Sequence, residues 1–259
     1  MKKQALHIVK IGGNIIDAPE ALASFLANFA SMPGPKLLVH GGGKIATSMA
    51  ADLGIQSQMI DGRRVTDSES LRIVTMVYAG WINKSIVASL QALHCNAIGL
   101  AGPDGGFVIS KKRNPVPIDY GFVGDIEHVN ASGLSGLIRT GLSPVFAPIT
   151  ADVSGQLLNT NADTMAQALA IALGAHFDVT LTYCFEKQGV LRDPSDDTSV
   201  IPQINQANFT QLKADGIVSA GMIPKLENAL KAIDEGVQTV RLCHADFVSQ
   251  PDKGTLIQA

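Results

Sequence analysis

The sequence predicts an α/β fold in which helices cover both faces of a mostly parallel sheet, giving a three-layer α/β/α sandwich. Short apolar runs, of the kind that form buried parallel strands, alternate with helix-like segments along the chain. The first two apolar runs end in glycines, Gly12-Gly13 and Gly41-Gly42-Gly43, before a helical pattern follows. With 259 residues, 46% of them hydrophobic, the chain can bury one large α/β core or two lobes.

Two strand-glycine-helix units open the chain. Apolar periodicity predicts strands over 6–11 and 37–40 and helices over 19–32 and 45–53. Because neighbouring parallel strands end at the same edge of a sheet, we expect the two glycine turns to lie side by side. Backbone N–H groups in such turns, at the positive ends of helices, are suited to bind an anion.

A long helix is expected next. Thr66-Asp67-Ser68-Glu69 is a capping-box sequence, and the helix that it opens runs to about Leu93. One apolar stripe at spacings of three and four follows this helix, whereas Val77, Trp81 and Val87 lie off the stripe. The stripe contains Leu71, Val74, Tyr78, Ile82, Ile86, Leu90 and Leu93. A helix that is apolar on more than one face is deeply buried or packs against another subunit, so we expect a homodimer contact here.

The rest of the chain continues the alternation of strands and helices. Extended segments are predicted over 57–66, 97–100, 143–149, 177–183 and 238–243, β-hairpins over 107–129, and helices over 132–139, 161–173, 209–214 and 224–235. Turn or loop sequences lie at 152–156 and 192–198.

Composition argues against several classes of function. The formal net charge is -3, from 20 basic and 23 acidic residues without a long run of either sign, so no surface for nucleic acid or an anionic membrane is expected. Cys95, Cys184 and Cys243 have neither the spacing of a disulfide framework nor that of a zinc site. Polar residues interrupt the long apolar runs, which argues against a signal peptide and a membrane span. We expect a cytoplasmic protein with reduced thiols.

The glycine turn after the second strand has two familiar interpretations. The nucleotide P-loop fails, because the residue after Lys44 is neither Ser nor Thr. The Rossmann fingerprint fits better, since Gly41, Gly43 and Ala46 match G-x-G-x-x-A. Asp61 lies about 20 residues on, as a ribose-binding acid does. An NAD-binding oxidoreductase is therefore one alternative.

Charged residues stand where a parallel sheet presents its ligand. Lys10 lies at the end of the first strand, beside a glycine turn, where snorkelling to solvent is the alternative. Lys225 lies at the start of a helix, where a cation opposes the helix dipole and invites a bound anion, with surface charge as the alternative. Asp163 is either a site residue or the N-cap of its helix. We expect His40 to be a hydrogen-bonded residue at the end of its strand and not a base.

Five short motifs follow one another along the chain, and none is specific alone. They are Lys10-x-Gly12-Gly13, His40-Gly41-Gly42-Gly43, Gly62-x-Arg64-Val65-Thr66, Asn159-x-Asn161-Ala162-Asp163 and Gly221-Met222-x-x-Lys225. Their order and spacing resemble the amino acid kinase family, and within it the members that phosphorylate N-acetyl-L-glutamate. The resemblance covers nearly the whole chain and argues against the Rossmann interpretation, in which Lys10 and Lys225 have no role.

The resemblance implies the amino acid kinase fold, with two lobes that share one sheet, and an enzyme activity. The expected reaction transfers the γ-phosphoryl group of ATP to the side-chain carboxylate of N-acetyl-L-glutamate, giving N-acetylglutamyl 5-phosphate for arginine biosynthesis. A carboxylate is already a competent nucleophile, so catalysis reduces to alignment and neutralisation of charge.

The resemblance also implies roles for individual residues. Lys10 and Lys225 stabilise the transition state, and Asp163 orients their two ammonium groups. The substrate-binding residues are Gly42, Gly43, Arg64 as a clamp on the α-carboxylate, and Asn159 on the acylamino group. The nucleotide-binding residues are Gly12, Gly13, Tyr183, Glu186, Gly189, Ile217, Val218 and Ser219. No metal-binding residue is expected, because Mg²⁺ comes with the nucleotide and keeps waters and phosphates as ligands. The family pattern does not require Lys44.

The sequence departs from the family pattern after the strand at 177–183. Family members usually have a short Thr-Asp-Val-x-Gly-Val-Leu run there. This chain instead runs from Thr182 through Glu186 to Gly189-Val190-Leu191, with three residues added and the usual aspartate displaced or missing. Glu186 is the candidate for its acidic role.

The organisation of the protein follows from the same resemblance. Residues 1–175 are expected to bind the acyl-amino acid and to dimerise, and residues 176–259 to bind ATP. The chain begins only a few residues before its first strand, so we expect a homodimer without the extra helix of the hexameric, arginine-inhibited members and without strong arginine feedback. Two further alternatives are a kinase for another N-acylated amino acid, such as N-succinylglutamate, and a non-catalytic nucleotide sensor.

Overall fold

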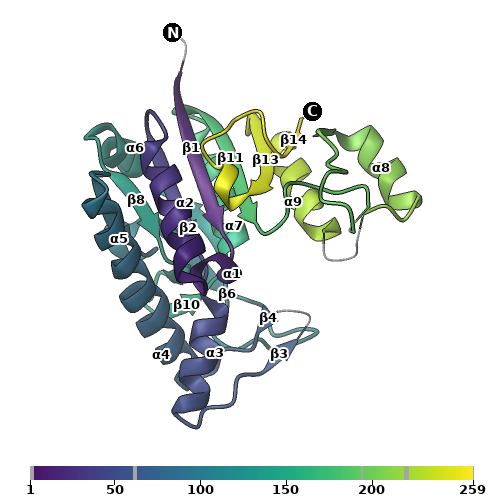
Figure 1. Ribbon diagram of the computed structural model, residues 1–259. Coiled ribbons are helices and arrows are strands. Elements are labelled where there is room, and N and C mark those ends of the chain that lie inside the picture. The colour runs from purple at the N-terminus through teal and green to yellow at the C-terminus, as the bar shows by residue number, and fades with distance from the viewer. Residues whose placement is uncertain (1–2, 61–62, 194, 219–221, 259) are drawn as a thin grey trace.

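An eight-stranded sheet, in the order β12-β14-β13-β11-β1-β2-β8-β5, forms the centre of the protein (Figure 1). The computed structural model describes residues 3–60, 63–193, 195–218 and 222–258. The strands are β1 Gln4–Ile11, β2 Lys36–His40, β5 Ala97–Leu100, β8 Ser143–Phe146, β11 Phe177–Phe185, β12 Gln203–Ile204, β13 Thr239–His244 and β14 Thr255–Ile257. Within this sheet only the pairing of β13 with β14 is antiparallel. The predicted, mostly parallel sheet is confirmed.

Helices cover both faces of this sheet. One face carries α2 Pro19–Ser31, the short η3 Ala245–Phe247 and the long helix made of α4 Ser68–Val74, η1 Thr75–Ile82 and α5 Asn83–Ala92. The other face carries α6 Ala131–Arg139, α7 Ala162–Leu173 and α9 Ile223–Asp234. The remaining helices are α1 Gly13–Ile16, α3 Gly43–Asp52, η2 Asp104–Gly106 and α8 Gln206–Ala214.

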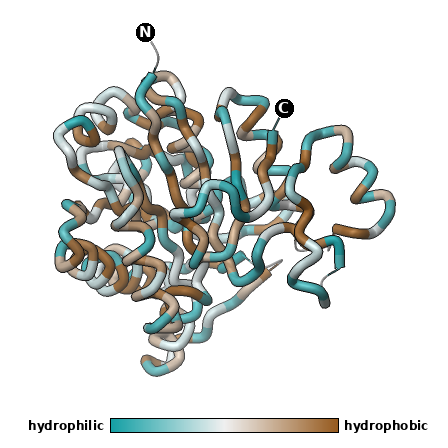
Figure 2. Tube along the Cα trace, turned by 45° about the horizontal axis from the view of Figure 1, so that its top comes forward, coloured by the Kyte–Doolittle hydropathy of each residue, from teal (hydrophilic) through white to brown (hydrophobic). Residues whose placement is uncertain are grey.

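Two hydrophobic clusters, one on each face, hold the three layers together. Side chains alternate along a strand, so Leu6 and Ile8 of β1 belong to the cluster beneath α7, whereas Val9 and Ile11 belong to the cluster beneath the long helix. Figure 2 shows hydrophobic segments running through the middle of the molecule. Burial on both faces explains why the strands are mostly apolar on both sides.

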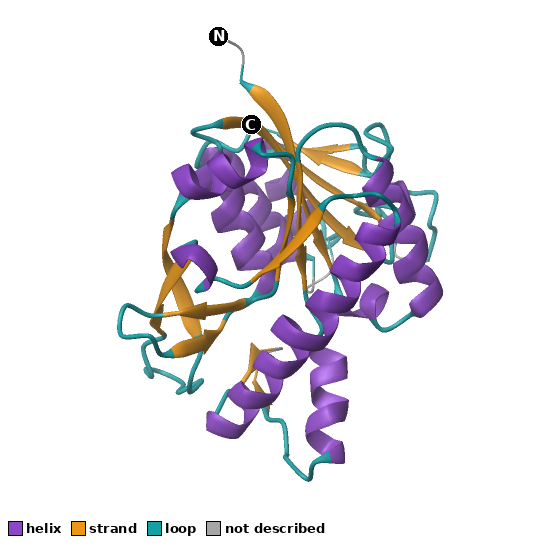
Figure 3. Ribbon diagram, turned by 90° about the vertical axis from the view of Figure 1, so that its left-hand side faces the viewer, coloured by secondary structure: helices purple, strands orange, loops and turns teal. Residues whose placement is uncertain are grey.

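Two smaller sheets lie beside the main one (Figure 3). The first contains β10 Leu157–Asn159, β9 Ile149–Ala151, β6 Val108–Lys112 and β7 Gly124–Val129, and the second pairs β3 Met59–Ile60 with β4 Arg63–Arg64. The hairpin expected within 107–129 is confirmed by the antiparallel pairing of β6 with β7. The single strand predicted over 143–149 is wrong, because Ala147 still bonds to Leu100 of the main sheet and the chain then enters the smaller sheet at Ile149. Pro148, which has no N–H to donate to a ladder, lies at this crossing.

The long helix is continuous over Ser68–Ala92, 25 residues, as predicted. Its N-cap is Asp67, whose carboxylate accepts a hydrogen bond from the backbone N–H of Ser70 at 2.7 Å. Its middle third, η1, is a π-helix, which the sequence does not predict. By length and composition the helix could span a membrane, but a core helix passes the same test, and 44% of its most apolar window is buried inside the protein.

The π-helical segment changes which residues the long helix buries. Val77, which we expected outside the buried stripe, is completely buried. Trp81 is 67% exposed, and Val87 is half-buried. The wider turn of a π-helix shifts side chains around the axis relative to an α-helical projection. Of the apolar residues off the stripe, Val77 therefore leaves less surface for a partner than predicted, whereas Trp81 stays exposed.

Several short elements of the described chain are absent from the predictions. They include α1, η2, β10, β12, η3 and β14, each of four residues or fewer. Segments of this length contain too few residues for a periodic pattern. The sequence analysis expected β13 to be the last strand of the sheet, but β14 follows it in the chain and pairs with it.

Candidate active site

An ion pair between Lys10 and Asp163 lies at the carboxyl end of β1. Lys10 faces the same side of the sheet as Leu6 and Ile8, which is the side that α7 covers. Asp163 is in the first turn of α7. The Lys10 Nζ atom lies 2.8 Å from the Asp163 Oδ1 atom, and the two side chains are 13% and 28% exposed. The pair is shielded but still accessible to a ligand.

Asp163 does not cap its own helix. The N-cap of α7 is Asn161, whose side-chain oxygen accepts a hydrogen bond from the backbone N–H of Thr164 at 3.0 Å. This leaves the Asp163 carboxylate available to Lys10. The interpretation of Asp163 as only a cap is therefore wrong.

β11 places two aromatic rings on the same side of the sheet as Lys10. Tyr183 is the register partner of Lys10, and its buried hydroxyl lies 3.4 Å from the backbone oxygen of Asp163, to which it donates. Burial, assisted by the Asp163 carboxylate, raises the pKa of Tyr183, so its hydroxyl stays protonated. The Nζ atom of Lys225, near the start of α9, lies 5.3 Å from the centre of the Phe185 ring.

Lys225 thus lies beside the end of β11, which pairs with β1, the strand that carries Lys10. Among the residues that the structure describes, no ion pair joins Lys225 to Asp163. The contact of Asp163 with Lys10 is present, and the expected contact of Asp163 with Lys225 stays a prediction.

The two glycine turns lie against each other, as expected. A Cβ atom added to Gly41 would lie 3.8 Å from the backbone nitrogen of Gly13, and one added to Gly13 would lie 3.9 Å from the nitrogen of Gly43. Gly12 is equally close to β11, since its Cβ would lie 3.9 Å from the Cys184 oxygen. Backbone atoms of neighbouring strands therefore meet at one place, beside the Lys10–Asp163 pair.

His40 is not available as a base. It is fully buried, its Nδ1 atom lies 2.9 Å from the Gly41 oxygen, and its Nε2 atom lies 3.1 Å from the amide nitrogen of Asn83. Burial lowers the pKa of His40 to about 4, so the ring is neutral near pH 7. The expectation of a hydrogen-bonded histidine is confirmed.

Arg64 is held rigidly beside the second glycine turn. Its Nη1 atom donates to the Ser57 hydroxyl at 2.6 Å, and its Nη2 atom donates to the Gly43 oxygen at 2.9 Å and to the Thr47 hydroxyl at 2.8 Å. Only 8% of the residue is exposed. Burial raises the pKa of Tyr78, and the Arg64 guanidinium beside its hydroxyl opposes that rise. A guanidinium fixed in this way keeps donors in a defined direction for a carboxylate.

Asn159 joins the smaller sheet to the segment that carries Arg64. Its side-chain amide donates to the Thr66 hydroxyl at 3.0 Å, and its backbone N–H donates to the Phe122 oxygen at 2.9 Å. Asn159 and Arg64 therefore lie on one connected wall of the site, formed by the ends of β10 and β4.

Three of the predicted nucleotide contacts in the carboxyl-terminal part line one cavity. Gly189, Ile217 and Val218 line a cavity of about 150 Å³ together with Lys187, Val190, Leu191 and Met222. Gly189 is packed tightly, since a Cβ there would lie 2.8 Å from the hydroxyl of Thr255. Glu186 is exposed just beyond β11. Ser219 lies outside the described residues, as do Asp61, Gly62 and Gly221 of the sequence motifs.

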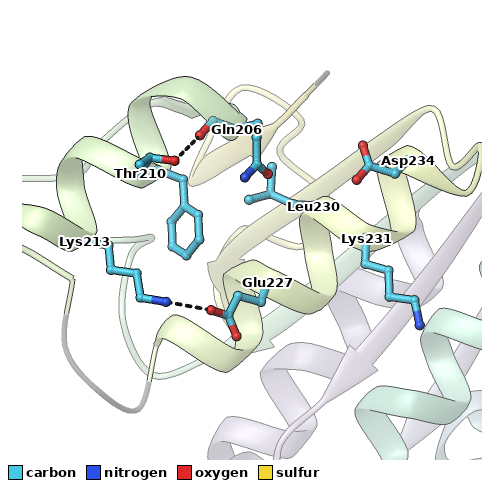
Figure 4. Close-up of a pocket in the computed structure, with 8 residues that line it drawn as sticks. Gln206, Thr210, Lys213, Glu227, Leu230, Lys231 and Asp234 are labelled. Atoms are coloured by element: carbon cyan, nitrogen blue, oxygen red, sulfur yellow. Dashed lines mark hydrogen bonds and ion pairs between the residues drawn. The ribbon is translucent and has the colours of Figure 1, made fainter.

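A larger cavity, of about 360 Å³, lies between α8 and α9 (Figure 4). Lys213 and Glu227 form an ion pair of 2.9 Å across it, and Phe209 lies beneath them. None of the predicted site residues is among the described residues that line it. In the described part of the chain, no cluster of three or more His, Cys, Asp or Glu side chains is arranged to hold a metal ion.

A model of the amino acid kinase family matches residues 5–244, which include every part of this site. The chain belongs to the amino acid kinase family. It is 56% identical to the acetylglutamate kinase of Cytophaga hutchinsonii, over 94% of this chain and 92% of that protein. It is 54% identical to the acetylglutamate kinase of Phocaeicola vulgatus, over 99% of each. A solved structure of carbamate kinase from Giardia lamblia, bound to AMP-PNP, has a TM-score of 0.69 at 14% identity, covering 99% of this chain and 98% of that one, and so shares the fold.

The resemblance to the amino acid kinase family predicted the motif residues of the site. It did not predict the residues that hold those side chains in place. Ser57, Thr47 and Tyr78 surround Arg64, and Asn83 contacts His40. The sequence offered one signal for this group, because Tyr78 lies on the buried stripe of the long helix. That signal predicts burial alone, since a periodic pattern does not say which partner a side chain meets.

Proposed function

We propose that the protein transfers the γ-phosphoryl group of ATP to the side-chain carboxylate of N-acetyl-L-glutamate, giving N-acetylglutamyl 5-phosphate and ADP, in arginine biosynthesis. The observation that carries the proposal is the near-full-length identity to proteins named acetylglutamate kinase. The site supports it, because the Lys10–Asp163 ion pair and the two glycine turns lie at the carboxyl ends of β1 and β2.

The reaction brings two anions together, so its main requirement is positive charge near the transferred group. An oxygen of the acceptor carboxylate attacks the γ-phosphorus, the bond from that phosphorus to the β,γ-bridging oxygen breaks, and ADP leaves with the electron pair. We assign Lys10 to the point where this charge develops, and Asp163 fixes its ammonium group. We assign Lys225, above Phe185, to the opposite side of the transferred group.

The acceptor lies, in this proposal, between the second glycine turn and the smaller sheet. Arg64 clamps its α-carboxylate, Asn159 binds its acylamino group, and the N–H groups of Gly42 and Gly43 donate to the reacting end. No proton leaves the nucleophile, so the reaction needs no general base. The neutral, hydrogen-bonded His40 agrees with that requirement.

ATP binds, in this proposal, mainly to the carboxyl-terminal part, at the cavity lined by Gly189, Ile217 and Val218, and also contacts the first glycine turn, Gly12-Gly13. Tyr183, Glu186 and Ser219 complete the predicted nucleotide contacts. Mg²⁺ binds to the phosphates of ATP and neutralises part of their charge. We propose on this basis that residues 1–175 bind the acceptor and residues 176–259 bind the nucleotide, with Gly12 and Gly13 of the first part also reaching the nucleotide.

The decisive experiment incubates the protein with Mg-ATP and either N-acetyl-L-glutamate or N-succinyl-L-glutamate, and traps the acyl phosphate with hydroxylamine. We expect hydroxamate from the acetylated acceptor and none when EDTA removes Mg²⁺. Hydroxamate from the succinylated acceptor alone would move the assignment to that substrate. Nucleotide binding without hydroxamate from either would favour a sensor, and binding of NAD would favour the oxidoreductase.

We further propose a cytoplasmic homodimer that associates through the long helix. Trp81 and Met76 of this helix are 67% and 47% exposed, and a pair of large apolar side chains on one helix is suited to a partner. Sedimentation should give a dimer, and Trp81→Glu should shift it to a monomer. Val153→Glu is the control, because Val153 is 90% exposed and lies in a turn outside the long helix. A monomeric wild-type protein would refute the proposal.

A further inference from the structure

The long helix is connected to the second glycine turn by a chain of buried hydrogen bonds. The side-chain amide nitrogen of Asn83 lies 2.9 Å from the Val145 oxygen and 3.1 Å from His40 Nε2. His40 Nδ1 lies 2.9 Å from the Gly41 oxygen. Asn83 is 1% exposed and His40 is 0% exposed. No step of the proposed reaction uses either residue directly.

In each hydrogen bond of this network, only one of the two groups can be the donor. The Val145 oxygen can only accept, so Asn83 must present its NH₂ group on that side. The same NH₂ group donates to His40 Nε2, which therefore carries no hydrogen. The hydrogen of the neutral ring must then be on Nδ1, from which it is donated to the Gly41 oxygen.

The direction of the Gly41 oxygen fixes the direction of the next N–H group. In a planar trans peptide the C=O and N–H bonds point in opposite directions, so the Gly42 N–H points away from the buried His40 ring. Among the described residues, the Gly42 N–H donates no hydrogen bond within the protein. Arg64 holds a separate peptide of the same turn, Gly43–Lys44, because it donates to the Gly43 oxygen at 2.9 Å.

A third glycine makes room for this arrangement. Gly99 lies on β5, and a Cβ there would lie 2.0 Å from Asn83 Oδ1 and 2.6 Å from the Nζ atom of Lys84. Lys84 in turn donates to Asn83 Oδ1 at 3.1 Å and to the Gly99 oxygen at 3.3 Å. Lys84 donates to the oxygen of the Asn83 amide. A flip of this amide would therefore lose that hydrogen bond as well as those of its NH₂ group to Val145 and His40.

We propose that Asn83 and His40 are positioning residues that hold the Gly41–Gly42 peptide in one orientation and so aim the Gly42 N–H at the reacting acceptor carboxylate. The inference rests on the proposed function for the identity of the reacting group. The hydrogen-bond chain itself does not depend on that identity. A donor fixed before the reaction stabilises developing charge without reorganisation, and a misplacement of about 1 Å can cost about 100-fold in rate.

The first test is spectroscopic and needs no substrate. In ¹⁵N-labelled protein at pH 7, the His40 ring should be neutral with its hydrogen on Nδ1, and Asn83→Leu should abolish this preference. A hydrogen on Nε2 in the wild-type protein would overturn the inference. Because this test measures no reaction, its failure is distinguishable from a failure of the proposed kinase activity.

The second test compares variants that keep different atoms of the ring. His40→Asn keeps a donor near the position of Nδ1, so kcat should stay within a few-fold of the wild-type value. His40→Gln loses that donor, and Asn83→Leu loses its support, so each should lower kcat by about 10- to 100-fold with little change in KM for ATP. Gly99→Ala, which displaces Asn83 without touching the site, should act in the same direction.

The control tests whether the loss is merely one of stability. Lys36 lies at the other end of β2, is buried, and donates to the Ala30 and Met32 oxygens at 2.6 Å each. Lys36→Met should lower the free energy of unfolding but leave kcat unchanged. An unchanged kcat in His40→Gln, or an equal loss of kcat in Lys36→Met, would overturn the inference. If Asn83→Leu fails to fold, Gly99→Ala and the wild-type spectrum still decide it.

Discussion

Replacing Gly42 with alanine should destabilise the protein through one identifiable clash. Gly42 has φ +143° and ψ +20°, a conformation that residues with a Cβ rarely adopt. A Cβ there would lie 2.2 Å from Ile82 Cδ1 and 3.3 Å from Tyr78 Cδ1. Carbon atoms in contact normally lie about 3.5–4.0 Å apart, so only the approach to Ile82 is a severe overlap.

The magnitude follows from two separate costs. The backbone conformation costs about 1–3 kcal/mol with a Cβ present, and the overlap costs about 1–3 kcal/mol as overpacking. Ile82→Val removes Cδ1, the atom in the clash, and by itself costs about 0.5–1.5 kcal/mol. The double variant keeps the backbone cost but loses the overlap. It should therefore be more stable than the sum of the two single changes predicts, by about 1–3 kcal/mol.

Urea unfolding of the four proteins measures this coupling. Ile86→Val is a matched control, because Ile86 is buried at 1% exposure on the same helix but is not among the atoms nearest Gly42. It should combine additively with Gly42→Ala. Effects of Gly42→Ala and Ile82→Val that add to within about 0.5 kcal/mol would refute the reasoning. The kcat of the double variant should also exceed that of Gly42→Ala.

Three further predictions concern the two lysines, Arg64 and His40. Lys10→Met and Lys225→Met should each lower kcat by about 100-fold or more through lost transition-state stabilisation, whereas Lys44→Met should not, and near-normal turnover in both would refute their roles. Arg64→Lys cannot keep the two-pronged geometry, so KM for the acyl-amino acid should rise at least about tenfold while KM for ATP is unchanged; an equal rise in both would contradict the clamp. Burial lowers the pKa of His40 from 6.5 to about 4, so between these values the unfolded chain binds a proton that the folded protein does not. Stability should rise with pH across this interval by roughly 3 kcal/mol, and His40→Asn should lose that part of the slope in urea unfolding; an unchanged slope would show that His40 is not the group.

Local patterns in the sequence determine most of the element order. The β1 and β2 strands are mostly apolar, as strands with helices on both faces are, so the glycine turns that follow them are visible as breaks in a run. Parallel order then predicts that the turns meet, which the close approach of Gly41 to Gly13 confirms. The register of alternation also places Lys10 on the face that α7 covers.

Only the tertiary structure decides which side chains touch. Asp163 has two local interpretations in sequence, and the packing of α7 on β1 selects the ion pair with Lys10 at 2.8 Å. Asn83 and His40 are 43 positions apart in the chain, so no short-range periodicity connects them. The π-helical segment likewise follows no periodic signal, yet it buries Val77 and exposes Trp81. The sequence alone determined which residue types stand at the ends of parallel strands, because periodicity is a local property. The partners of those residues depended on the tertiary structure, because contacts between distant elements are set by packing.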